Sequence, residues 1–209
     1  MTVDRPIVFV VDDDARVRAA LSSLLASAGL EVAVFASATE FLEADKPDAP
    51  ACLVLDLELP DISGLELQRE LAEREAPPIV FITGHGDIPS SVKAMKAGAI
   101  EFLAKPFGDE ELLRGIEAAI ALDRAERLKR TERAELDDRY ARLTPREREV
   151  LTFVVAGFAN KLTAGELGTS EITIGVHRGQ IMRKMGARSL PELVRFADKL
   201  GIPPAPGTK

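Results

Sequence analysis

The sequence has very few of the residues that usually form disulfide bonds or metal clusters. Its single cysteine, Cys52, can form no disulfide within the chain and no site with several cysteine ligands. Its two histidines, His85 and His177, are too few for a metal cage built from imidazoles. Because Cys52 lies in the apolar run 52–55, we interpret it as a core residue. These counts exclude cysteine-rich and histidine-rich metal centres.

The sequence also lacks a long apolar run. No stretch approaches the roughly 18 apolar residues that span a bilayer, and the first residues lack the charged-then-apolar pattern of a signal peptide. We therefore expect a cytoplasmic protein that does not contact a membrane. Its 46% hydrophobic and 29% charged residues are sufficient for a folded core, and its 209 residues favour two domains.

Acidic residues outnumber basic ones, but the excess lies in one part of the chain. The net charge is −7 for the whole sequence, −12 for residues 1–122, +1 for 123–142 and +4 for 143–209. An acidic part followed by a basic part is typical of a regulatory module joined to one that binds a polyanion.

The first 120 residues alternate between short apolar runs and helical periodicity. Val17, Leu21 and Leu24, for example, recur at steps of three and four residues. Parallel strands need crossover connections, and the helices in those connections cover both faces of the sheet. We therefore predict an α/β domain with a doubly wound sheet of five parallel strands. The predicted strands are residues 7–11, 32–35, 52–55, 79–83 and 99–103.

A segment of mixed charge follows this domain. Residues 123–142 carry both signs of charge, contain no glycine or proline, and have only scattered apolar positions such as Leu128 and Leu136. We interpret the segment as an extended solvated helix that links two domains. A disordered charged tether is the alternative.

A second, all-α domain begins at Thr144. Thr144, Pro145 and Glu147 supply an N-cap hydroxyl, a proline at the first helical position and the glutamate of a capping box. Four helices follow, and glycine ends the first three. Residues 202–209 contain three prolines, and we expect them to form a loose tail. The predicted helices are residues 145–156, 160–167, 170–185 and 190–200.

Polar side chains follow several of the predicted strands. Asp12 and Asp13 follow the first strand and Asp56 follows the third, while Thr83 ends the fourth and Lys105 follows the fifth. Ligands of an open α/β sheet bind at the carboxyl ends of its strands, so these side chains should converge. Clustered carboxylates repel one another unless a cation joins them, and oxygen ligands suit Mg²⁺ bound beside a phosphate. Taken alone, any one of these acids could instead be a helix cap, because each stands in the loop between a strand and the following helix.

Together these residues resemble the receiver domain of bacterial response regulators, over residues 4–122. The resemblance rests on Asp12-Asp13, Asp56-Leu57-Glu58-Leu59-Pro60 with Gly64 beyond it, Thr83-Gly84 and Lys105-Pro106. It implies a flavodoxin-like fold in which Asp56 is the phosphorylated nucleophile, and Thr83 and Lys105 contact the phosphoryl group. The implied ligands of Mg²⁺ (or Mn²⁺) are Asp12, Asp13, Asp56 and the backbone carbonyl of Glu58.

The resemblance also implies a switch. An acyl phosphate adds charge and acceptor oxygens, which can draw the Thr83 hydroxyl inward and bias a two-state surface. Phe102 stands at the family's aromatic switch position; ordinary core packing is the alternative, and both can hold.

Two further features of the pocket follow from the resemblance. Lys105-Pro106 resembles the family's cis peptide bond. His85, within a Thr83–Asp87 segment similar to FixJ-type regulators, either modulates access to the pocket or positions water for dephosphorylation.

Residues 143–201 resemble the helix-turn-helix domain of LuxR and FixJ-type regulators. The resemblance rests on the segment 143–151, Asn160-Lys161, Leu167-Gly168-Thr169-Ser170, Thr173-Ile174, His177, Ile181 and Lys184-Met185. Helical spacing places Ile174, His177, Ile181 and Met185 on one face, which should pack inward. The opposite face should enter the major groove of DNA with Gly175, Val176, Gly179, Gln180 and Arg183. The residues placed for the DNA backbone are Lys161, Ser170, Thr173 and Lys184.

The predicted recognition helix is basic but contains two glycines. Between Glu171 and Glu192 the chain has four basic and no acidic residues, which favours phosphate contact over a merely solvated surface. Members of this family often carry a long polar side chain where Gly175 and Gly179 stand. Each glycine costs a helix interior roughly 1 kcal/mol. We therefore expect this helix to be less stable in the free protein and to become stable when it is bound to DNA.

The two resemblances together imply a DNA-binding response regulator of a two-component system. The implied donor is a sensor histidine kinase, and phosphorylation of Asp56 is expected to promote a homodimer that binds promoter DNA and activates transcription by RNA polymerase. The chain is then no enzyme beyond its own phosphoryl transfer and slow autodephosphorylation. Two alternatives are a phosphatase that acts on small phosphate esters and a C-terminal domain that binds protein or RNA.

Overall fold

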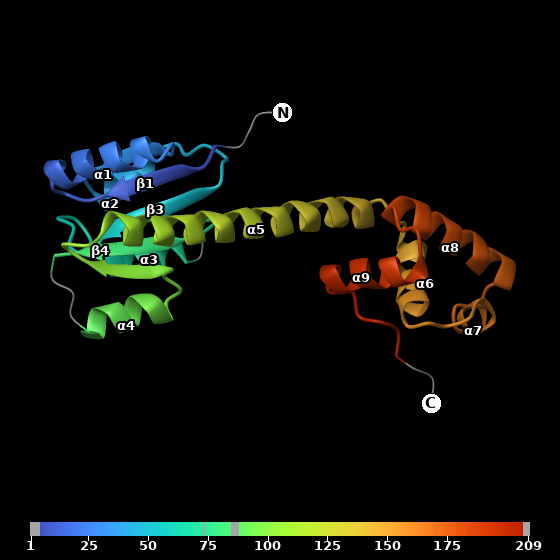
Figure 1. The fold of residues 1–209 in the computed structure, drawn as a ribbon. Coiled ribbons are helices and arrows are strands. Elements are labelled where there is room, and N and C mark those ends of the chain that lie inside the picture. Colours follow the sequence, from blue (N-terminus) through green and yellow to red (C-terminus); the bar gives the residue numbers. More distant parts are fainter. Residues whose placement is uncertain (1–4, 73, 85–87, 207–209) are drawn as a thin grey trace. The chain divides into compact units, whose positions relative to one another are not determined.

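The computed structural model describes residues 5–206 except residues 73 and 85–87. The chain divides into two units, one that ends at Arg127 and one that begins at Leu128 (Figure 1). The first unit packs its apolar residues on both faces of a sheet, and the second has a helical core of its own. None of the helices in the described part of the chain is both long and apolar enough to cross a membrane.

The first unit is built on five parallel strands in the order β2-β1-β3-β4-β5. This order confirms the predicted doubly wound sheet, because the chain winds outward from β1 in one direction and then in the other. The strands are β1 (Ile7–Val11), β2 (Glu31–Phe35), β3 (Ala51–Asp56), β4 (Ile79–Thr83) and β5 (Glu101–Ala104).

Helices cover both faces of the sheet, and alternate strand residues meet them. Val8 and Val10 pack with α1 (Ala15–Ser27) and the first half of α5 (Asp109–Ala141). Phe9 and Val11 point to the other face, which is covered by α2 (Ala38–Glu43), α3 (Gly64–Leu71) and α4 (Ile88–Lys96). Both faces are buried, which explains why the strands read as continuous apolar runs. Cys52 is fully buried in the first of these cores, as predicted.

Two of the differences from the predicted strand bounds, at the end of β3 and at the start of β5, have a clear structural reason. β3 includes Asp56, so this carboxylate stands on the last residue of a central strand. β5 begins at Glu101 and not at residue 99, because Gly98 has a φ of +91° and the N–H of Ala99 bonds to Ala94 O at the end of α4. Ala99 therefore closes a helix and cannot enter the sheet.

The segment predicted to link the domains is helical and lies within α5. The buried Asp123 accepts hydrogen bonds from the N–H of Ala51 (2.9 Å) and from Arg127 Nε (2.7 Å), which tie it to the first unit. Further along, Arg133 donates to the carbonyls of Lys199 and Leu200 in the second unit. Most other residues of 123–142 are exposed, as predicted for a solvated helix, and only Asp123 and Leu136 are buried.

The second unit contains α6 (Pro145–Val155), α7 (Asn160–Glu166), α8 (Glu171–Met185) and α9 (Leu190–Leu200). The predicted capping box is present at α6: the Thr144 hydroxyl accepts from the N–H of Glu147, and the Glu147 carboxylate accepts from the N–H of Thr144. Gly186 ends α8 with a left-handed φ of +70°, a conformation that favours glycine.

The predicted loose tail is wrong for part of its length. Ala205 is buried, and its N–H bonds to Thr152 O at 2.9 Å. The flanking prolines restrict the backbone, so ordering this segment costs little conformational entropy. Residues 207–209 of the predicted tail lie outside the described residues.

Candidate metal centre and nucleic-acid interface

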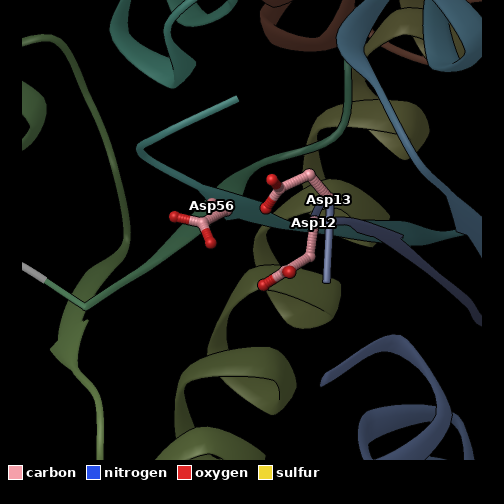
Figure 2. Close-up of side chains that lie close together, drawn as sticks. All are labelled: Asp12, Asp13 and Asp56. Atoms are coloured by element: carbon pink, nitrogen blue, oxygen red, sulfur yellow. The ribbon is translucent and has the colours of Figure 1, made fainter. Parts of the chain in front are cut away.

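Three carboxylates meet at the carboxyl ends of β1 and β3. Asp12, Asp13 and Asp56 each offer an oxygen, and these oxygens all lie within 4.8 Å of one another (Figure 2). Asp12 and Asp56 are buried, whereas Asp13 is exposed. The sheet order explains the meeting, because β1 and β3 are neighbours with Val11 paired to Leu55. The sequence prediction that these acids converge is therefore confirmed.

Lys105 joins the two buried carboxylates. Its Nζ donates to Asp12 Oδ2 and to Asp56 Oδ2, both at 2.7 Å. Burial raises the pKa of Asp12 above its ordinary value of 3.8, although the bonds from Lys105 act in the other direction. Burial would lower the pKa of Lys105, but its bonds to Asp12 and Asp56 outweigh burial and raise it. The ammonium thus offsets part of the repulsion between two carboxylates that lie close together.

The donor set fits a hard divalent cation. Carboxylate oxygens from three residues stand close together, one of them at the protein surface, which suits Mg²⁺ because that ion keeps several waters. Asp56 Oδ1 accepts the N–H of Glu58 at 3.1 Å, which places the loop after β3 against the same carboxylate. The cluster is therefore compatible with Mg²⁺, and the Glu58 carbonyl as a further ligand stays a prediction.

The remaining predicted pocket residues come from β4 and β5. Thr83 is fully buried at the end of β4, and its carbonyl accepts the N–H of Lys105 at 2.7 Å. Phe102 is half-buried on β5, with its ring centroid 6.1 Å from that of Phe81. The Lys105-Pro106 peptide bond is cis, as predicted. His85 lies outside the described residues.

Arg18 contacts this site but was not identified from the sequence. Its Nη1 donates to the backbone carbonyls of Asp12 (2.6 Å) and Asp13 (2.9 Å), so one guanidinium holds the loop that carries both acids. The available signal was a basic residue in the first turns of the helix that follows the acid pair. Periodicity alone assigns such a residue to the solvated face of the helix.

Gly64 is required by close packing beside Asp56. A Cβ at this position would lie 2.5 Å from the backbone oxygen of Asp56, 3.1 Å from Leu57 Cα and 3.0 Å from the Phe81 ring. Two of these contacts are to backbone atoms, which cannot move aside as a flexible side chain can. The start of α3 thus packs directly against the strand end that carries the candidate nucleophile.

The second unit presents one side of α8 to solvent. Ile174, Ile181 and Met185 are fully buried on the opposite side, and His177 is half-buried. Ser170 caps the helix by accepting the N–H of Thr173 at 3.1 Å. Among the predicted groove residues, Gly175, Val176, Gly179 and Arg183 are exposed, whereas Gln180 is half-buried and hydrogen-bonded to Arg183. Lys161 is exposed on α7.

Lys184 has a partner that the sequence did not reveal. Its Nζ donates to the buried carboxylate of Glu147 at 2.6 Å, which links α8 to the capping box of α6. Burial would raise the pKa of Glu147, but the bonds from Lys184 and from the Thr144 N–H outweigh burial and lower it below the ordinary value of 4.5. Lys184 therefore has a structural role, and its predicted contact with the DNA backbone stays a prediction.

The two glycines of α8 leave its exposed side open. A Cβ at Gly179 would meet nothing within 4 Å, and a Cβ at Gly175 would meet only Asn160 Nδ2 at 3.7 Å. Neither glycine is therefore required by packing within the described protein.

Comparison with known proteins identifies both units. Residues 8–117 match the family model of the response regulator receiver domain, and residues 141–197 match that of the luxR family of bacterial regulatory proteins. Nodulation protein W of Bradyrhizobium diazoefficiens is 50% identical over 199 residues, which cover 95% of this chain and 88% of the relative. The transcriptional regulatory protein FixJ of Azorhizobium caulinodans is 45% identical over 199 residues, which cover 95% of this chain and 94% of the relative.

Solved structures lead to the same group of proteins. A low-resolution structure of the response regulator StyR is 49% identical with a TM-score of 0.83, and the match covers 93% of this chain and 99% of the StyR chain. Full-length FixJ from B. japonicum is 42% identical with a TM-score of 0.55, and the match covers 94% of this chain and 97% of that structure.

Proposed function

Because the chain belongs to the two-component response regulators that join a receiver domain to a LuxR-family DNA-binding domain, we propose that phosphorylation of Asp56 controls its binding to promoter DNA. The chain acts in the cytoplasm, its phosphoryl donor is a sensor histidine kinase, and its phosphorylated form is a homodimer that activates transcription by RNA polymerase. The proposal is carried by one observation: the Lys105 ammonium bridges the carboxylates of Asp12 and Asp56 at the strand ends.

The proposed boundaries follow the role of each segment. We assign residues 4–122 to the receiver domain, 123–142 to the helical linker and 143–201 to the DNA-binding domain. The hydrogen bonds of Asp123 to Ala51 and of Arg133 to the end of α9 support this division, because the first part of the segment bonds to the receiver domain and its middle bonds to the DNA-binding domain.

The proposed reaction is phosphoryl transfer from a phosphohistidine to Asp56. A carboxylate oxygen of Asp56 attacks phosphorus, the P–N bond breaks, and the imidazole leaves with a proton on its nitrogen. Charge in the transition state spreads over three equatorial oxygens, so catalysis depends on positioning and on nearby positive charge. Lys105 supplies one such charge, since its ammonium already lies 2.7 Å from Asp56. Mg²⁺, held by Asp12, Asp13, Asp56 and the Glu58 carbonyl, would supply the remaining positive charge.

We propose that the acyl phosphate then acts on β4 and β5. The hydroxyl of the buried Thr83 bonds to a phosphoryl oxygen, which shifts the end of β4 and the packing of Phe102 against Phe81. The half-buried position of Phe102 supports this role, because the ring can gain or lose burial. Slow autodephosphorylation ends the signal, and we propose no turnover of other substrates.

The proposal is tested by treating the full chain with beryllofluoride and Mg²⁺, or with acetyl phosphate and Mg²⁺. We expect the solution mass to rise from monomer to dimer and the affinity for duplex DNA to rise with it. Mass by light scattering and DNA affinity by fluorescence anisotropy are measured on the same samples. An unchanged mass and an unchanged affinity would contradict the proposal.

The predicted DNA contacts are separated by substitutions on α8. We expect Gln180→Ala or Arg183→Ala to reduce the preference for a selected site over random duplex by roughly tenfold, because these side chains face base edges. Lys184→Ala should weaken binding to both duplexes alike, because it removes a charge and not a base contact. Binding to both duplexes is measured at one fixed salt concentration.

Glu147→Gln is the control for Lys184. It removes the carboxylate partner of Lys184 but keeps the ammonium that would meet DNA. If Glu147→Gln weakens binding as much as Lys184→Ala does, Lys184 acts through the fold of the domain. If all three α8 variants lose affinity equally on both duplexes, the assignment of Gln180 and Arg183 to base contacts is wrong.

A further inference from the structure

The exposed side of α8 carries large apolar side chains at its N-terminal end. Ile172 is 82% exposed, more than any other large apolar side chain in the described part of the chain. Val176, one helical turn later, is 58% exposed. Apolar residues of this size usually contribute to a core, and the core of this unit is already formed by the opposite side of α8 through Ile174 and Ile181.

The residues beside this pair offer few polar groups. Gly175 and Gly179 have no side chain, and a Cβ at Gly179 would meet nothing within 4 Å. Gln180 and Arg183 stand further along the helix and are hydrogen-bonded to each other. The face of α8 centred on Ile172 and Val176 therefore presents methyl groups, whereas the nearby hydroxyls of Ser170 and Thr173 are hydrogen-bonded to each other.

We propose that Ile172 and Val176 recognise the C5-methyl groups of thymines in the major groove. The inference rests on the proposed function, in which α8 is the recognition helix. The N-terminal residues of a recognition helix contact base edges, and thymine is the base that presents a methyl group there. The missing side chains at Gly175 and Gly179 let the helix approach the bases closely enough for methyl groups to touch. The exposed cation Lys161 on α7 is placed to contact the phosphate backbone beside this face.

The test uses the full chain activated with beryllofluoride and Mg²⁺. Binding sites are first selected from random duplex DNA. Each thymine of a selected site is then replaced by deoxyuridine, which keeps the base pair and removes only the methyl group. We expect a loss of affinity of about fourfold at one or two positions of each half-site, which is the effect of exposing one methyl group. Affinity is measured by fluorescence anisotropy.

The same duplexes are measured with Ile172→Ala and Val176→Ala. Each variant should bind the selected site more weakly and should lose its sensitivity to deoxyuridine at one of those positions. Leu162→Ala is the matched control, because Leu162 is 60% exposed on α7 and is not part of the proposed contact. It should keep the full deoxyuridine effect.

The outcomes separate this inference from the proposed function. If the protein binds selected DNA but deoxyuridine has no effect at any position, the inference is overturned and the proposed function still stands. A deoxyuridine effect that is equal in wild type, Ile172→Ala and Val176→Ala assigns the methyl contact to other residues and also overturns it. If no duplex is bound at all, the proposed function fails and this inference fails with it.

Discussion

Asp56→Asn should abolish the response of this protein to phosphoryl donors. We expect phosphate incorporation from acetyl phosphate to fall by at least about 100-fold, because an amide is a poor nucleophile. The substitution preserves the shape of the side chain, and Lys105 keeps its 2.7 Å bond to Asp12, so the fold should persist. Dimer formation and DNA binding should then stay at the level of the untreated protein.

Asp14→Asn is the matched control for this substitution. Asp14 lies two residues from Asp12, and its side chain caps α1 by accepting the N–H of Arg16 at 2.8 Å. Asparagine caps helices about as well as aspartate, so the local structure should be retained. We expect normal phosphate incorporation, measured by Phos-tag electrophoresis or mass spectrometry. If Asp56→Asn responds to phosphoryl donors as Asp14→Asn does, Asp56 is not the phosphoacceptor.

Gly64→Ala should damage both the stability of the first unit and its reactivity. The added Cβ would lie 2.5 Å from the backbone oxygen of Asp56, so the strand end or the start of α3 must move. Overpacking of this kind costs about 1–3 kcal/mol of unfolding free energy. A displaced Asp56 should also react more slowly, by about 10- to 100-fold, because a misplacement of about 1 Å can cost that much.

Gly108→Ala provides the comparison for Gly64→Ala. A Cβ at Gly108 would meet nothing within 4 Å, so its effect on stability should stay within about 0.5 kcal/mol. Both variants are compared with wild type by calorimetry and by the rate of phosphorylation from acetyl phosphate. If the two variants have the same stability and the same phosphorylation rate, the start of α3 accommodates the added Cβ without strain and does not position Asp56.

The parts of the fold that could be predicted from the sequence are those encoded locally. The apolar runs that form β1 and β4 match the observed strands, and the Thr144–Glu147 capping box lies where its spacing indicated. These signals are short-range, since each depends on residues within one helical turn or one strand. The β5 boundary was missed because Ala99 is apolar, and only its bond to Ala94 shows that it ends α4.

The candidate site was predictable for a related reason. Parallel strands of a doubly wound sheet end at a common edge, so Asp12, Asp56 and Lys105 had to meet once their strands were recognised. Arg18 was missed because it reaches the site through backbone carbonyls, which no residue pattern marks. Ile172 was missed because an isoleucine in a helix is ordinarily a core residue, and its exposure depends on how α8 is rotated in its domain.

The sequence by itself determined the two-domain organisation, the family, and the acids that converge at the strand ends. Strand runs, helix caps and motif spacing all act over a few residues, and these are properties that a sequence displays directly. Tertiary structure decided which partners meet over long separations: Lys184 with Glu147, and Ala205 with Thr152. Such contacts depend on distances between segments that lie far apart in the chain, and those distances are set only when the helices and strands pack.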